Sequence, residues 1–162
     1  YAQVKAAAVE GGAKVHLASG AIGGFDVLQT VTLMAQAQGL PETAGIETHT
    51  GAKGFRNTPV WAEHLLTDTE KTTVFTGNAK QAIATFPRRV NVAVATSLAT
   101  TGPESTGVTM HSVPGWVGDD HCITAEIEGV KAVVDICSST SAIAGWSAVS
   151  LLRNLASPVC FY

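Results

Sequence analysis

A glycine-rich segment is the clearest chemical feature of the sequence. Residues 19–24 read SGAIGG and are followed by Asp26, a good cap for an amphipathic helix. A segment with so few side chains exposes backbone N–H groups, and at the start of a helix these groups suit a carboxylate, an amide or a phosphate. The spacing is neither GxGxxG nor that of a P-loop, because no Gly-Lys-Ser/Thr follows. A tight turn without a ligand is an equally good interpretation.

His121 is the next candidate for chemistry. It follows Asp119 and Asp120 at a predicted junction between a loop and a strand, where the carboxylates favour a protonated ring. A titratable imidazole is suited to general acid or base catalysis, although a histidine without a chemical role is the more common case. Cys122 follows directly, but neighbours on a strand point to opposite faces, so a Cys/His nucleophile pair is not expected.

The sequence predicts no metal site and no disulfide framework. The other histidines are His16, His49, His64 and His111, and a multi-histidine site would need the fold to bring them together. The three cysteines are Cys122, Cys137 and Cys160. Their odd number and the lack of a CxxC pair exclude a zinc ribbon and favour a reducing cytoplasm as the location of the protein.

Two further polar features are an asparagine within an apolar run and a Ser/Thr-rich segment before a predicted helix. Asn91 lies within an apolar run, where a buried amide must be hydrogen-bonded, so it positions either a helix or a ligand with equal weight. Residues 138–141 read SSTS before a predicted helix. Capping of that helix is the simplest role for them, and anion binding at the same helix end is the functional alternative.

Composition excludes several classes of protein. The chain has 162 residues, of which 14% are charged, and a formal net charge of -3, so a single domain with a real core is expected, rather than a coiled coil or a disordered tail. Arg88-Arg89 is the longest basic cluster, which argues against nucleic-acid binding. No run approaches the roughly 18–20 consecutive apolar residues that span a bilayer, so no membrane segment is predicted.

The elements that must position these residues follow from periodicity and from turn signals. Strands are predicted at residues 13–18, 44–50, 72–76, 106–113, 121–128 and 130–136. Helices are predicted up to residue 12, then at 26–39, 58–66 and 79–85, and from 139 or 140 to about 155. Residues 90–99 fit a strand or a helix, and the helix is favoured. Together they predict an α+β fold, a mixed, largely antiparallel sheet with helices packed on one face.

These features together resemble the aspartate dehydrogenase family. Residues 19–26, SGAIGGFD, are nearly the SGAIGGLD signature of that family, and ordered matches follow at Phe86-Pro87, Asn91-Val92-Ala93, His121, Thr140-Ser141 and Ser147. The resemblance covers almost the whole chain. It implies that residues 1–18 are the last helix and strand of a nucleotide-binding domain of the Rossmann type. Residues 19–162 would then be the catalytic, substrate-binding and dimerisation domain.

The resemblance also implies an activity. Members of the family oxidise L-aspartate by hydride transfer to NAD or NADP, and the imine serves NAD biosynthesis or is hydrolysed to oxaloacetate and ammonia. By position, His121 matches the catalytic histidine, and Ala21 and Asn91 match cofactor-contacting residues. The matches also imply substrate-binding roles for Ser19, Gly20, Lys53, Thr140 and Ser141. The cofactor would be bound mainly by the N-terminal domain, and the protein would be a homodimer.

The chain departs from the family pattern at several positions. Ala52 stands where the family has an arginine, Arg89 and Asp119 where it has asparagines, and Cys137-Ser138 where it has Asn-Pro. An aspartate carboxylate therefore lacks one cationic partner unless Arg56, Arg88 or Arg89 replaces it. A relative that acts on another amino or hydroxy acid is one alternative. A non-catalytic binding or oligomerisation module is another.

Overall fold

The computed structural model describes residues 1–161 and contains one five-stranded sheet. Its strands are β1 (Thr43–Thr50), β2 (Thr72–Asn78), β3 (Gly107–Ser112), β4 (Asp119–Ile127) and β5 (Val130–Ser138), in the spatial order β2-β3-β1-β4-β5. Only β1 and β3 pair in parallel, and the other three neighbouring pairs are antiparallel. The predicted mixed, largely antiparallel sheet is confirmed.

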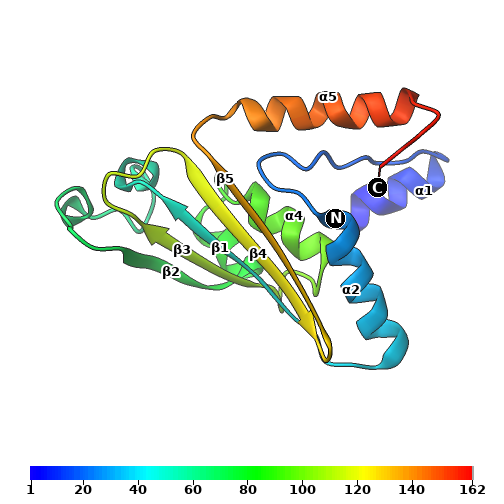
Figure 1. The fold of residues 1–162 in the computed structure, drawn as a ribbon, viewed down its shortest axis with the longest axis horizontal. Coiled ribbons are helices and arrows are strands. Elements are labelled where there is room, and N and C mark those ends of the chain that lie inside the picture. The colour runs from blue at the N-terminus through cyan, green and yellow to red at the C-terminus, as the bar shows by residue number, and fades with distance from the viewer. Residues whose placement is uncertain (162) are drawn as a thin grey trace.

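The helices cover one face of this sheet and leave the other face bare. They are α1 (Ala2–Glu10), α2 (Phe25–Gln38), α3 (Ala79–Thr85), α4 (Asn91–Ala99) and α5 (Ala142–Ala156), with 3-10 turns η1 (Ala52–Phe55) and η2 (Glu63–Leu66). Helices α2, α3 and α4 pack against the strands, whereas α5 runs apart from the sheet and has no buried residue (Figure 1). We call the covered side the packed face and the other side the bare face.

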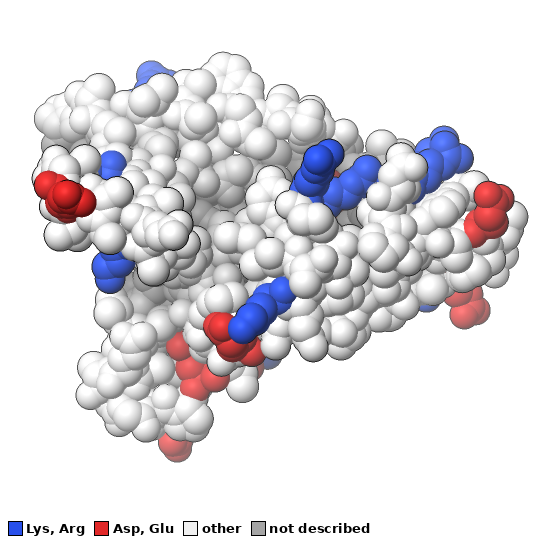
Figure 2. Space-filling view, turned by 180° about the vertical axis from the view of Figure 1, so that it is seen from behind, with Lys and Arg blue, Asp and Glu red and all other residues white. Residues whose placement is uncertain are grey.

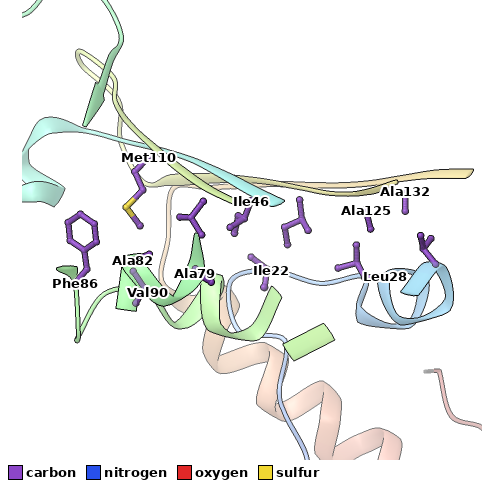
Figure 3. Close-up of a cluster of buried hydrophobic side chains, with 14 of the residues drawn as sticks. Ile22, Leu28, Ile46, Ala79, Ala82, Phe86, Val90, Met110, Ala125 and Ala132 are labelled. Carbon is purple, nitrogen blue, oxygen red and sulfur yellow. The ribbon is translucent and has the colours of Figure 1, made fainter. Parts of the chain in front are cut away.

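The core lies between the packed face and the helices. Alternate residues of each strand point to the same side, so the apolar members of β1, β3 and β4 meet the helices α2, α3 and α4 in one layer (Figure 3). The largest fully buried apolar side chains are Leu28, Val31, Val108 and Ile123. Their removal from water is the main stabilising contribution to this layer.

The glycine-rich segment is shaped by packing against β5. Gly24 has φ +67°, and a Cβ there would lie 2.4 Å from a methyl carbon of Val134, so a side chain would both clash and strain the backbone. A Cβ on Gly23 would touch Ile136. Gly24 is also the N-cap of α2, and the predicted cap Asp26 lies inside the first turn instead, where its charge favours the positive helix end.

Two predicted elements are wrong. Residues 13–18 form no strand, and Val15 and Leu17 are 57% and 56% exposed, because no described strand lies beside this segment to pair with its backbone. The predicted helix at 58–66 is reduced to η2. The hydroxyl of Thr58 donates to the carbonyl of Phe55 at 2.6 Å, so Thr58 closes the preceding turn and does not cap a new helix.

Helices α3 and α4 agree with their sequence signals, and α5 differs at its first turn. Asn78 and Gln81 form a reciprocal capping box at α3, and residues 91–99 are helical, as favoured. At α5 the helix begins at Ala142, later than the expected 139 or 140, and its N-cap Ser141 makes no side-chain capping hydrogen bond. The hydroxyl of Thr140 accepts a hydrogen bond from the N–H of Ala142 at 3.2 Å. Among residues 1–161, no helix combines the length and apolar character needed to cross a bilayer. Much of the surface seen in Figure 2 carries no charge.

Candidate functional site

A cavity of about 400 Å³ opens on the packed face, between the sheet, α4 and the glycine-rich segment. It brings together Ala21, Asn91 and His121, which are far apart in the sequence. Thr48 of β1, Arg89 and Asp119 are further polar residues in its wall. The three residues that match the catalytic and cofactor positions of the family therefore share one cavity.

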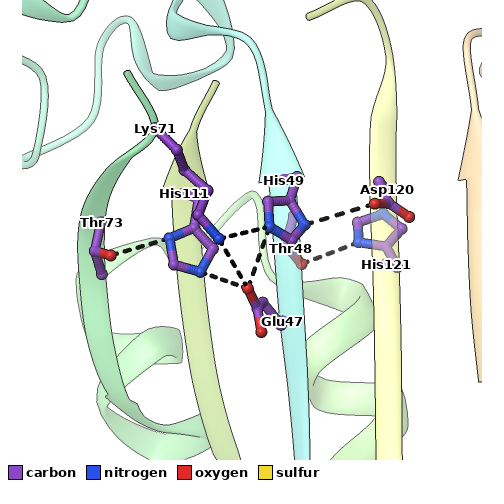
Figure 4. Close-up of polar contacts among 8 residues, drawn as sticks. All are labelled: Glu47, Thr48, His49, Lys71, Thr73, His111, Asp120 and His121. Carbon is purple, nitrogen blue, oxygen red and sulfur yellow. Dashed lines mark hydrogen bonds and ion pairs between the residues drawn. The ribbon is translucent and has the colours of Figure 1, made fainter. Parts of the chain in front are cut away.

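His121 is the titratable group buried deepest in this cavity. The register of β4 against β1 places it opposite Thr48, and the hydroxyl of Thr48 lies 3.0 Å from His121 Nδ1 (Figure 4). The residue is 6% exposed. Because Thr48 holds Nδ1, Nε2 is the ring atom without a hydrogen bond to any residue in the described part of the chain, and it is free to exchange a proton.

Burial decides the charge of His121. Desolvation lowers the pKa of the imidazole, although the carboxylates of Asp119 and Asp120 act in the opposite direction. The two carboxylates do favour a protonated ring, as expected, but the loss of hydration outweighs their attraction and favours the neutral ring. A neutral imidazole near pH 7 can accept a proton, as a general base requires.

Asn91 has a different environment from the one expected. It is the first residue of α4 and is exposed, whereas a buried amide was predicted. Asn91 reaches the cavity wall because α4 begins there. The preceding turn is closed by the N–H of Arg89, which donates to the carbonyl of Phe86, and Val90 is the N-cap of the helix. The exposed amide is free to contact a ligand.

The glycine-rich segment contributes less to this cavity than its composition indicates. Ala21 lines it, but Ser19 and Gly20 do not. The N–H of Gly20 donates to the hydroxyl of Ser147 on α5 at 2.9 Å, so it serves the contact with α5. Ser19 instead lines a second cavity of about 780 Å³ between the N-terminal segment, α2 and α5.

Three other matched positions also lie outside the wall of the His121 cavity. Lys53 is exposed on η1, and Thr140 and Ser141 are exposed in the connection from β5 to α5. Of the three arginines that could replace the missing cation, Arg89 lines the cavity, and its guanidinium donates to the carbonyl of Gly54. Arg56 instead stacks over Trp61, with its guanidinium carbon 5.6 Å from the ring centre.

Sequence reasoning did not find Thr48. Its hydroxyl contacts His121 only because of the strand register, and no local sequence pattern predicts that pairing. The same is true of His49 and His111, which the parallel pairing of β1 and β3 places side by side on the bare face. A histidine cluster is therefore present where the sequence predicted none.

Comparisons with known proteins identify related sequences. The sequence matches the family described as "Aspartate dehydrogenase, C-terminal" over residues 31–155. L-aspartate dehydrogenase of Methanosarcina acetivorans is 34% identical over an alignment of 162 positions, which covers 94% of this chain and 58% of that protein. L-aspartate dehydrogenase of Ruegeria pomeroyi is 36% identical over 126 residues, which is 77% of this chain and 44% of that protein.

A solved structure gives the same result in three dimensions. The crystal structure of aspartate dehydrogenase from Thermotoga maritima matches with a TM-score of 0.73 and 29% identity, over 93% of this chain and 57% of that one. The chain thus spans about half the length of the relatives it matches. Because the family match extends over most of the sequence and the sheet and helices superpose as well, this chain belongs to the aspartate dehydrogenase family, as its C-terminal domain.

Proposed function

We propose that this chain is the substrate-binding and catalytic part of an oxidoreductase that oxidises the α-amine of L-aspartate with NAD or NADP. The product is iminoaspartate, which is released for NAD biosynthesis or hydrolyses to oxaloacetate and ammonia. The observation that carries the proposal is the single cavity that gathers Ala21, Asn91 and His121. The names of the relatives support the choice of reaction.

The chain's own contribution is placement and proton transfer. Before a C=N double bond can form, the substrate ammonium must lose one proton. In the tautomer in which Nδ1–H donates to the hydroxyl of Thr48, neutral His121 accepts that proton at Nε2. In the opposite direction the protonated ring returns the proton to nitrogen. Burial therefore sets His121 to act as the base in amine oxidation.

The residues present fit the nicotinamide end of a dinucleotide. Ala21 adds only a methyl group to the cavity wall and leaves room for a flat ring, and the exposed amide of Asn91 can pair with a carboxamide. A bound nicotinamide supplies the acceptor for the hydride that leaves Cα. Ala21 and Asn91 would hold and orient it beside His121.

Arg89 and Asp119 give the cavity one positive and one negative group. Arginine binds carboxylates through two parallel hydrogen bonds, so Arg89 is the carboxylate partner in our proposal. Asp119 can attract the substrate ammonium. The pair suits a zwitterionic amino acid better than a hydroxy acid, which has no ammonium group.

A second domain is part of the proposal. Exposed apolar side chains surround the larger cavity, and such surfaces are characteristic of interfaces. They include Val15, Leu17, Leu33, Leu155 and Phe161. We infer that a nucleotide-binding domain packs there, with residues 1–18 as its last part and residues 19–162 carrying the site. The protein would act as a homodimer in the cytoplasm.

An assay of the full-length protein tests the proposed reaction. Reduction of NAD and of NADP is followed by absorbance with L-aspartate, L-glutamate and L-malate as separate substrates. We expect L-aspartate to give the highest kcat/KM. Preference for L-malate would overturn the role given to Asp119, and oxidation of none of the three would overturn the reaction itself.

A non-catalytic oligomerisation module is the second candidate, favoured by the bare face of the sheet, which no described element covers. Light scattering at several concentrations measures the mass of the full-length protein. A dimer without dehydrogenase activity would support the module. A monomer that oxidises L-aspartate would exclude it, and would also contradict the proposed homodimer.

A further inference from the structure

A row of polar residues crosses the bare face. The strand register places Thr73, His111, His49 and Asp120 side by side on β2, β3, β1 and β4. Residues two apart on a strand point to the same side, so Glu47 shares the face of His49. Glu47, His49 and His111 therefore form one compact group, which we call the bare-face triad (Figure 4).

The distances within the bare-face triad are those of ligands that can share an ion. Glu47 Oε1 lies 2.8 Å from His111 Nε2 and 3.2 Å from His49 Nε2, and one ligand atom from each residue lies within 4.8 Å of the others. Zinc binds such nitrogen and oxygen atoms at about 2.0–2.2 Å, so the ligands of one tetrahedral ion are roughly 3.3–3.6 Å apart. Small side-chain adjustments bring the three atoms to that separation.

The far side of His111 is held as in known metal centres, and the far side of His49 faces a carboxylate. Histidine ligands usually direct their second ring nitrogen to an outer polar group, which fixes the ring. His111 Nδ1 lies 3.0 Å from the hydroxyl of Thr73, and His49 Nδ1 lies 3.6 Å from Asp120 Oδ2. Within residues 1–161, His49 Nδ1 and Asp120 Oδ1 are buried without a hydrogen bond. A cation on Nε2 would make Nδ1–H a stronger donor and draw His49 and Asp120 together.

We propose that Glu47, His49 and His111 bind one divalent transition-metal ion of the zinc type. Two imidazoles and one carboxylate form a ligand set that zinc prefers, with a fourth position left for water. The Glu47 side chain is 44% exposed, so the ion reaches the site from the bare face. The site is independent of the proposed dehydrogenase site, because Thr48 and His121 point to the packed face.

Lys71 is the competitor of this ion. Its Nζ lies 3.3 Å from His49 Nε2 and 3.5 Å from Glu47 Oε1, the same atoms that would bind the metal (Figure 4). The side chain is half-exposed and its four-carbon stem is flexible, so it can move into solvent when an ion arrives. Removal of the ammonium should therefore strengthen metal binding.

A titration of the full-length protein with Co²⁺ alone tests the proposal, because Co²⁺ replaces zinc in such sites and absorbs visible light. We expect saturation at one equivalent and displacement by Zn²⁺. Glu47→Gln and His111→Ala should each weaken binding by about 100-fold or more, since loss of an outer partner already costs about 10–100-fold. His64→Ala is the matched control, because His64 pairs with Asp68 at 3.2 Å but has no second imidazole, and binding should be unchanged.

Two further variants sharpen the result. Asp120→Asn should weaken binding by about 10-fold, whereas Lys71→Ala should tighten it. Glu47 is half-exposed, so Glu47→Gln keeps the fold if His111→Ala does not, and circular dichroism checks both. No saturable binding by the natural protein, full affinity in Glu47→Gln, or unchanged or weaker binding in Lys71→Ala would overturn the proposal. Dehydrogenase activity is not the readout, so this outcome is separate from the proposed reaction.

Discussion

The two faces of the sheet give their histidines different partners. On the packed face, His121 is a single imidazole whose protein partner is the neutral hydroxyl of Thr48. On the bare face, His49 and His111 stack with ring centres 4.8 Å apart, in contact with the carboxylate of Glu47. The first arrangement favours proton exchange by a neutral ring, and the second concentrates ligand atoms for a cation.

Moving one residue along a strand changes the face of the sheet to which a side chain points. Thr48 and His49 are neighbours on β1, and Asp120 and His121 are neighbours on β4. Because successive side chains point to opposite faces, each pair contributes one residue to the cavity on the packed face and one to the row of polar residues on the bare face. A shift of the register by one residue would exchange the two chemistries.

The largest expected effect is the loss of dehydrogenase activity when His121 on the packed face is replaced. Replacing His121 with alanine removes the proposed base, and general acid–base catalysis is worth about 100–10,000-fold, so we expect kcat for L-aspartate oxidation to fall by that factor. Steady-state kinetics of the full-length protein measure it, with His64→Ala as the control. Co²⁺ binding by His121→Ala should be unchanged. Undiminished activity would remove His121 from the mechanism.

The next effect is a difference in the free energy of unfolding between substitutions on the packed face and on the bare face. Ile123 on the packed face is fully buried, and Ile123→Ala should lower the free energy of unfolding by about 2–5 kcal/mol. Val133 on the bare face is 54% exposed, and Val133→Ala should change it by only about 0.5 kcal/mol. Urea denaturation followed by circular dichroism measures both. Equal losses would mean that the bare face is covered in the intact protein.

Arg89 tests the substrate side of the packed face. Hydrogen bonds to charged groups are worth about 1.5–3 kcal/mol, so Arg89→Ala should raise KM for L-aspartate by about 10–100-fold. Arg56→Ala is the control, because Arg56 contacts Trp61 and does not line the cavity. A larger effect in the Arg56 variant would assign the carboxylate to a different cation.

The smallest effect concerns pH. Burial lowers the pKa of His121 below its ordinary value of 6.5, so the unfolded chain binds more protons and stability is lost as the pH falls below 6.5. On the bare face, burial alone would raise the pKa of Glu47, but His111, His49 and Lys71 together hold it below 4.5. The stability that Glu47 provides is therefore lost only below pH 4.5.

Denaturation at a series of pH values measures this dependence. His121→Gln should flatten the curve just below pH 6.5, and Glu47→Gln should flatten it only below pH 4.5. If His121→Gln leaves the curve near pH 6 unchanged, burial does not control the charge of this imidazole.

Local signals explain which parts of the fold could be predicted. Asn78 and Pro87 bound α3, and residues 79–85 were expected with the observed limits. The strands of the sheet follow from alternation, because one side of each is buried. The same alternation failed at residues 13–18, where no described strand pairs with the segment. Thr58-Pro59 failed because the Thr58 hydroxyl closes the preceding turn.

The candidate site was only partly predictable. A resemblance of motifs indicated Ala21, Asn91 and His121, and the structure brings them into one cavity. It leaves Ser19, Gly20, Lys53, Thr140 and Ser141 outside the wall of that cavity. Thr48 could not be predicted, because its role depends on which residue of β4 it faces.

Composition, periodicity and turn residues were sufficient for the α+β class and for most elements, because these depend on neighbours along the chain. His121 was selected by its match to a family motif, and its catalytic role stays a proposal. The charge of His121 was decided by tertiary packing, since desolvation by the surrounding layers outweighs the two adjacent carboxylates. The bare-face triad was decided in the same way. His49 and His111 meet only because β1 and β3 pair in parallel, and strand pairing is a long-range choice that no local pattern encodes.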